Sequence, residues 1–146
     1  MGLVDAEIWT RSTRRVTAHR SRAIEDKESA RWLSGCQAAT SVLSEAAEVT
    51  MVSDRESDMY LLFARKPQRL DLIVRAAQDR SLADGEKLFQ ALSGAEPLSR
   101  SEVRVAPRGP GDKGRVATVE LRATSVRIAR PQGMPRSEAP EAIELS

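Results

Sequence analysis

Three acidic side chains, Asp54, Glu56 and Asp58, lie within five residues of one another in the stretch "VSDRESD". Carboxylate oxygens are hard ligands of the kind that Mg²⁺ and Mn²⁺ prefer. Acids at a strand-to-helix junction are also common as turn formers and helix caps. The residues alone therefore leave two interpretations open: a metal-binding carboxylate, or a solvated turn with a helix cap.

The elements around this stretch alternate between strand-like and helix-like patterns. The segment just before it, "VTMVS", is short and β-branched, as a buried parallel strand should be. Apolar residues at helical spacing precede that segment, and a second apolar strand follows it. The sequence predicts strands and helices in alternation at 2–9, 27–48, 49–53, 58–65, 70–76 and 84–94. This order is typical of an α/β layer with parallel strands.

The predicted sheet gives the acids different places. Ligands of an open parallel sheet bind outside the carboxyl ends of its strands, and Asp54 directly follows one strand. Asp54 is therefore the candidate metal ligand. Asp58 is placed to cap the next helix, and Glu56 lies in the turn between them. We expect structural roles for Glu56 and Asp58.

The second half of the chain has a different pattern. From Pro97 onward, "SEVRVAP" and "RVATVELRATSVRIA" alternate between polar and apolar residues, with a turn-rich break between them. This pattern predicts antiparallel strands. Residues 131–146 contain three prolines and no strong period, so we expect an irregular tail. The predicted organisation is an α/β core over 1–96, a β-rich part over 97–130 and the tail over 131–146.

Composition limits the classes of function. The chain has 146 residues, 40% of them hydrophobic and 30% charged, which is typical of a folded globular domain. Aromatic residues make up only 3%, which argues against a base-stacking surface. Cys36 is the only cysteine, so no intrachain disulfide and no cysteine-based zinc site are expected. No apolar run approaches the roughly 20 residues of a membrane helix, and we expect a cytoplasmic protein without a membrane partner.

Basic residues are concentrated in two segments. Residues 11–22 contain five arginines and one histidine without an acid, including the adjacent pair Arg14 and Arg15. Residues 103–130 contain seven arginines or lysines and two acids. Each segment suits either a solvated surface or contact with a polyanion such as DNA.

The string "VSDRESDMYLLF" resembles the second-aspartate motif of bacterial cut-and-paste DDE transposases of the insertion-sequence type. That motif is a short apolar strand followed by Asp-Arg-Glu-x-Asp and then an aromatic residue. Three further segments, "GLVDAEIWTR", "KESARWL" and "LDLIVRAAQDR", resemble other parts of this family in the same order. Together they cover about residues 1–80.

The resemblance implies a partial ribonuclease-H-like fold followed by a β-rich insertion subdomain. It implies metal-assisted phosphoryl transfer on DNA, with Mg²⁺ or Mn²⁺ expected only in the complete enzyme. Asp54 matches the second catalytic carboxylate and metal ligand, while Arg75 and Arg80 match basic positions that reach DNA. The implied partners are transposon-end and target DNA and a second copy in a synaptic homodimer, in a nucleoid-associated setting.

Two of the family's three catalytic acids have no match here. The first belongs on a strand upstream of "GLVDAEIW", and no later segment fits the helix that carries the last. We therefore expect a central transposase fragment that is inactive alone and has an open, aggregation-prone sheet edge. One alternative is a non-catalytic DNA-binding or interaction remnant that interferes with a full-length transposase. Another is a haloacid-dehalogenase-type phosphatase, which requires Asp-x-Asp where Glu56 occupies the second acid position.

Overall fold

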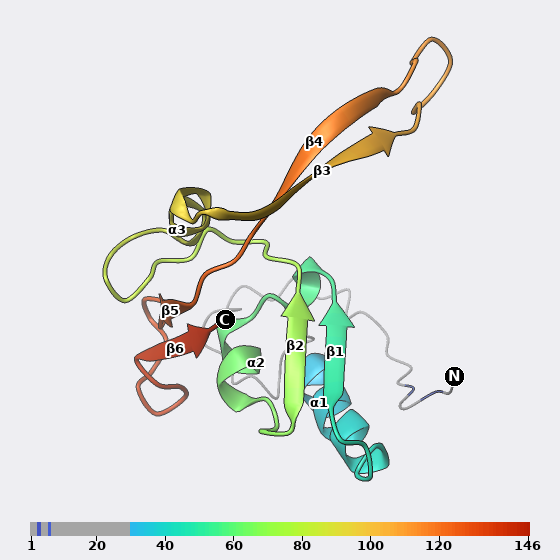
Figure 1. Ribbon diagram of the computed structural model, residues 1–146. Helices are drawn as coiled ribbons and strands as arrows, with labels where there is room; N and C mark the ends of the chain where they lie inside the picture. Colours follow the sequence, from blue (N-terminus) through green and yellow to red (C-terminus); the bar gives the residue numbers. More distant parts are fainter. Residues whose placement is uncertain (1–2, 4–5, 7–29) are drawn as a thin grey trace, which may run out of the picture. The chain divides into compact units, whose positions relative to one another are not determined.

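The computed structural model describes residues 3, 6 and 30–146, and shows a mixed α/β protein with three small sheets in that part of the chain (Figure 1). The chain divides into two compact units. The first comprises the chain up to Gln78 together with Gln132–Pro140, and the second comprises Asp79–Pro131 with Glu141–Ser146. The strand predicted over 2–9 lies outside the described residues, apart from two isolated positions.

The first unit is built on two parallel strands, β1 (Val49–Ser53) and β2 (Leu70–Val74). They pair in register, from Val49 opposite Leu70 to Ser53 opposite Val74, which confirms the predicted parallel pair. Exposed residues alternate with buried or half-buried ones along each strand, because side chains of a strand point to opposite faces in turn. The pair therefore has one covered face and one exposed face.

The covered face packs against helices α1 (Ala30–Val42) and α2 (Tyr60–Arg65). The core between them consists of four buried residues, Cys36, Val49, Leu62 and Leu70. Trp32, Leu33 and Leu72 are among the partly buried residues that pack around these four. Burial of these apolar side chains is the main force that holds the helices to the sheet.

Helix α1 ends earlier than the sequence pattern predicts. The expected helix over 27–48 stops at Val42, and residues 27–29 lie outside the described residues. The chain has to reverse before β1 begins, and the Arg69 guanidinium stabilises that turn by donating to the Ser44 and Ala46 carbonyls, each at 2.9 Å. Tertiary contact here overrides local helix propensity.

The segment 132–140 belongs to the first unit. The Tyr60 hydroxyl donates to the Pro140 carbonyl at 3.0 Å, and the Arg65 guanidinium donates to the Glu138 carbonyl at 3.1 and 3.2 Å. Ala139 is buried. The segment 132–140, which has no regular secondary structure, is thus fixed to α2 by hydrogen bonds that its sequence does not predict.

The second unit contains α3 (Leu88–Gly94) and two antiparallel pairs. Strands β3 (Pro97–Val105) and β4 (Arg115–Arg122) form a long hairpin, and β5 (Val126–Ala129) pairs with β6 (Ala142–Leu145). In Figure 1 the hairpin extends away from α3 and from the β5–β6 pair.

Two sequence-based expectations are wrong in this unit. The tail predicted to be irregular contains β6, because "AIEL" is too short to show a period but finds a partner in β5. The helix predicted over 84–94 begins only at Leu88, because Asp84 folds the preceding residues into a turn. Its carboxylate accepts from the Glu86 amide at 3.0 Å, and Gly85 adopts a φ of 94°.

Candidate functional site

Asp54 lies directly after β1, at the carboxyl end of the parallel pair. It precedes a short 3₁₀ turn, η2 (Arg55–Ser57), and caps that turn by accepting from the Glu56 amide at 3.0 Å through Oδ1. The residue is exposed, and within the described part of the chain its Oδ2 atom has no hydrogen-bond partner. Asp54 therefore serves as a turn cap and still offers one carboxylate oxygen to a ligand.

Arg75 occupies the matching place after β2. Ser53 and Val74 are paired, and the Arg75 amide donates to the Ser53 carbonyl at 3.2 Å, so the ladder continues to this point. Neighbouring strands lie about 4.8 Å apart. Arg75 is exposed, and no described residue binds its guanidinium. A carboxylate and an arginine thus follow adjacent strands at the same edge of the sheet.

Glu56 has a structural contact instead of an open carboxylate. Its Oε2 atom lies 2.6 Å from the Arg31 guanidinium of α1. The pair is partly exposed, with 27% of the Arg31 side chain and 58% of the Glu56 side chain accessible. It links η2 to α1, although a partly exposed pair of this kind adds little to stability.

Asp58 does not cap α2, contrary to the prediction. The N-cap residue is Met59, whose side chain makes no capping hydrogen bond. The Asp58 carboxylate is buried, with 5% of the residue exposed, and accepts from the Ala77 amide at 2.6 Å and the Gln78 amide at 3.1 Å. The Ala77 and Gln78 amides follow the end of β2 and need a hydrogen-bond acceptor. The Asp58 carboxylate accepts from them, and it therefore does not accept from the amides at the start of α2.

The two loops that leave the sheet are therefore connected. Asp58, which follows η2, binds the backbone just beyond Arg75, and the buried Ser57 hydroxyl contacts the Ser53 hydroxyl at 2.5 Å and the Asp54 carbonyl at 2.9 Å. The connection fixes the backbone on both sides of the Asp54–Arg75 edge. Sequence spacing could not reveal it, because residue 58 begins one predicted element and residue 77 lies after the end of another, 19 positions along the chain.

The donor set of this edge is suited to a divalent cation but is incomplete in the described part of the chain. No three histidine, cysteine, aspartate or glutamate side chains of the described residues lie close enough together to hold a metal ion. Asp54 supplies a hard oxygen, whereas Glu56 and Asp58 are engaged elsewhere. One carboxylate holds Mg²⁺ weakly, so a metal site at this edge would require carboxylates in addition to Asp54.

The other predicted site residues lie elsewhere. Arg80 belongs to the second unit, where it is half-buried and its carbonyl accepts from the Leu88 amide at 2.9 Å. Arg14 and Arg15 lie outside the described residues. Of the predicted set, the structure brings together Asp54 and Arg75.

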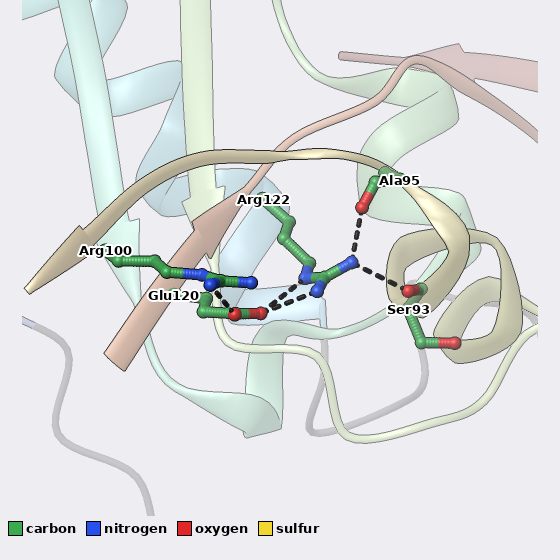
Figure 2. Close-up of polar contacts among 5 residues, drawn as sticks. All are labelled: Ser93, Ala95, Arg100, Glu120 and Arg122. Atoms are coloured by element: carbon green, nitrogen blue, oxygen red, sulfur yellow. Dashed lines mark hydrogen bonds and ion pairs between the residues drawn. The ribbon is translucent and has the colours of Figure 1, made fainter. Parts of the chain in front are cut away.

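A second polar arrangement, which sequence analysis did not find, fixes the base of the β3–β4 hairpin (Figure 2). The Arg122 guanidinium donates to two backbone carbonyls at the end of α3, that of Ser93 at 2.8 Å and that of Ala95. It also donates to the Glu120 carboxylate at 2.6 Å. Arg100 lies 2.7 Å from the same carboxylate. The hydrogen bond from Arg122, together with the charge of Arg100, lowers the pKa of Glu120.

The chain was compared with known proteins, and neither a family model nor a curated protein matched it. In the described part of the chain, every helix is too short or too polar to cross a lipid bilayer.

Proposed function

We propose that this chain contributes the second catalytic aspartate, Asp54, to the active site of a DNA transposase of the insertion-sequence type. In this proposal β1, β2 and α1 are part of a ribonuclease-H-like core, and the β3–β4 hairpin belongs to an insertion subdomain. The reaction is phosphoryl transfer at transposon ends, and it requires two further carboxylates besides Asp54.

The observation that carries the proposal is the position of Asp54. The motif residue stands at the carboxyl end of a parallel strand, which is where α/β sheets place their ligands. It is exposed and retains one free oxygen among the described contacts, while its two acidic neighbours are held by Arg31 and by backbone amides. Arg75 stands beside it with an unengaged guanidinium, as a group that binds a phosphate should.

Mg²⁺ or Mn²⁺, bound by the three carboxylates of the assembled site, would supply an activated hydroxyl and neutralise charge on the leaving oxygen. Asp54 would hold one side of that site through its hard oxygen. Arg75 would orient the DNA phosphate, and the Asp58 contact would keep the Arg75 loop at the correct distance from Asp54.

Nicking of supercoiled plasmid DNA tests the proposal. The protein should be produced together with the polypeptide encoded on either side of this segment, which the proposal expects to supply the missing acids. Nicking should require Mg²⁺ or Mn²⁺ and should stop with a chelator. Nicking that persists without a divalent cation, or flanking sequence without acidic candidates, would contradict the proposal.

The exposed cations of the β3–β4 hairpin favour a second candidate, a DNA-binding protein without catalytic activity. Four cations of the hairpin are exposed, and the described residues form no ion pair with them: Arg104, Arg108, Lys113 and Arg115. All of these except Arg108 also line an open hollow. This candidate predicts DNA binding that does not depend on Asp54 and no nicking in any combination with flanking sequence. The same plasmid assay therefore separates the two functions.

A further inference from the structure

The segment 132–140 belongs to one unit and connects two strands of the other. The chain leaves the second unit after Pro131 and returns to it at Glu141. Strand β5 lies just before this segment and β6 just after it, and both strands belong to the second unit. We call residues 132–140 the strap. The strap thus belongs to the first unit, although it connects a strand pair of the second.

Two side chains of α2 hold the strap in the first unit. The Arg65 guanidinium donates to the Glu138 carbonyl from Nε at 3.2 Å and from Nη2 at 3.1 Å. The Tyr60 hydroxyl donates to the Pro140 carbonyl at 3.0 Å. Ala139, which lies between these two carbonyls in the sequence, is buried with 7% of the residue exposed. The second half of the strap is therefore fixed on α2 by both hydrogen bonds and burial.

The strap has little conformational freedom to lose when it binds α2. Proline restricts φ to about −65°, and the strap contains Pro135 and Pro140. The Glu138 amide donates to the Pro135 carbonyl at 3.1 Å. Gly133 has a φ of 82°, which glycine adopts without the steric cost of a Cβ. Fewer accessible conformations in the free segment mean a smaller loss of entropy on binding.

The β5–β6 pair is short and depends on the connection between its strands. Each strand has four residues, and β6 pairs with no strand other than β5 among the described residues. An isolated two-stranded pair is at best marginally stable in water. Pairing also closes a loop over residues 130–141, whose ends meet where the Arg130 amide donates to the Glu141 carbonyl at 2.8 Å. A loop that is already fixed at an internal point costs less entropy to close.

We infer that the strap couples the two units through the chain itself, so that its binding to α2 stabilises the β5–β6 pair. Such coupling is reciprocal, and pairing of β6 with β5 must in turn favour binding of the strap. In the first unit, α2 follows the turn that Asp54 caps. In the second unit, β5 is joined to the segment before α3, where the Ala83 amide donates to the Arg127 carbonyl at 2.8 Å. The inference concerns the fold and holds for either proposed function.

Hydrogen–deuterium exchange measured by mass spectrometry on the full chain tests this inference. The strap variant is Arg65→Met, which removes the donors to Glu138 and keeps an unbranched apolar side chain. The control variant is Arg69→Met, which removes the same kind of contact in the same unit, because Arg69 donates to the Ser44 and Ala46 carbonyls in the turn before β1. Peptides that cover β1, the strap and β6 are followed in each protein.

Exchange of β6 should be roughly tenfold faster in Arg65→Met than in the parent chain, because hydrogen bonds from a charged donor are lost and local opening becomes easier. The control variant should leave β6 at the parent rate, even where β1 exchanges faster. Unchanged β6 exchange in Arg65→Met would overturn the inference. Equal acceleration of β6 in both variants would also overturn it, because the effect would then reflect general loss of stability in the first unit.

Exchange of β1 also shows whether Arg65→Met has opened the first unit as a whole. In that case Tyr60→Phe, which removes a single hydroxyl and keeps the ring, supplies the comparison. It should accelerate β6 a few-fold and leave β1 at the parent rate. Unchanged β6 exchange in Tyr60→Phe would then overturn the inference.

The reciprocal arm weakens the strand pair and measures the strap. Ile143→Ala removes the side chain opposite Ile128, which is fully buried on β5. This variant should accelerate exchange of the strap as well as that of β6. Glu144→Ala, at an exposed residue of the same strand, is the control and should leave the strap at the parent rate. Faster exchange of β6 in Ile143→Ala with an unchanged strap would contradict the coupling.

Discussion

At the scale of single residues, Asp54, Glu56 and Asp58 share one motif but have three different environments. Asp54 caps η2 and keeps one oxygen available, Glu56 pairs with Arg31, and Asp58 is buried against backbone amides. A buried carboxylate that accepts two amide hydrogen bonds is costly to remove, because the amides lose an acceptor that the rest of the fold does not replace. Asp58 is therefore the acid that supports the local fold, and Asp54 is the acid to which the proposed function assigns catalysis.

Replacement of Asp58 should destabilise the first unit more than replacement of an exposed acid. Asp58→Ala removes the acceptor of the Ala77 and Gln78 amides and should lower the free energy of unfolding by about 1–3 kcal/mol. Asp58→Asn should have a smaller effect, because its carbonyl oxygen can still accept. The measurement is urea unfolding followed by circular dichroism. The control is Asp71→Ala on the exposed face of β2, and equal stability of the Asp58 and Asp71 variants would show that the contact is unimportant.

Cys36 reports on the core of the same unit. The thiol is buried, and burial raises its pKa, with a smaller opposing effect from the Lys66 charge. The thiolate is the reactive form, so alkylation at neutral pH should be slow in the folded chain. Val49→Ala, which trims the core around Cys36, should accelerate alkylation measured by mass spectrometry. Val52→Ala, at a residue that is 73% exposed, should not, and rapid alkylation of the parent chain would contradict the described core.

At the scale of elements, sequence periodicity was sufficient to predict the strands whose own residues show a clear polar and apolar pattern. It identified "VTMVS" and "LDLIVRA" as parallel strands, the second two residues longer than β2, and the alternating segments after Pro97 as antiparallel ones. It failed at β6, whose four residues show no period, and at the end of α1, where Arg69 stabilises a turn. It also predicted that Asp58 caps the helix that follows it. Helix propensity describes residues that are close in sequence, whereas the Ala77 amide is close to Asp58 only in space.

The hairpin anchor is an element-scale feature with a pH dependence. The pKa of Glu120 is lowered, first by its hydrogen bond from Arg122. A carboxyl whose pKa is lower in the folded than in the unfolded state adds stability above its ordinary pKa. That stability is lost as the pH falls through the lowered value. Acid should therefore loosen the hairpin from α3.

Carbon-13 NMR titration of the Glu120 carboxyl measures this effect directly. The midpoint should lie below the ordinary glutamate value in the parent chain and should rise in Arg122→Gln, which removes the main donor. Arg127→Gln, on β5, should leave the midpoint unchanged. A Glu120 midpoint that does not respond to Arg122→Gln would show that the contacts of Figure 2 do not persist in solution.

At the scale of the whole molecule, the two units carry different features. The first presents Asp54 and Arg75 at one edge of a parallel pair, and the second carries a hairpin that is anchored at its base and cationic at its tip. Sequence placed Asp54 directly after a strand with a clear pattern, whereas Arg75 was predicted inside the strand over 70–76 and follows β2 because that strand ends at Val74. Sequence could not separate anchoring arginines from available ones, since that difference depends on Glu120 and on carbonyl groups at the end of α3.

The central claim is that Asp54 is a catalytic carboxylate and not only a turn cap. The measurement is plasmid nicking by the protein together with a polypeptide that supplies the two further carboxylates of the proposed site, with Asp54→Asn compared with Asp71→Asn. Asparagine can still cap η2 through its carbonyl oxygen, so the fold should be retained, and circular dichroism checks this. We predict that Asp54→Asn reduces the nicking rate by about a hundredfold or more, whereas Asp71→Asn retains it. A folded Asp54→Asn protein that nicks DNA as fast as the parent would contradict the claim.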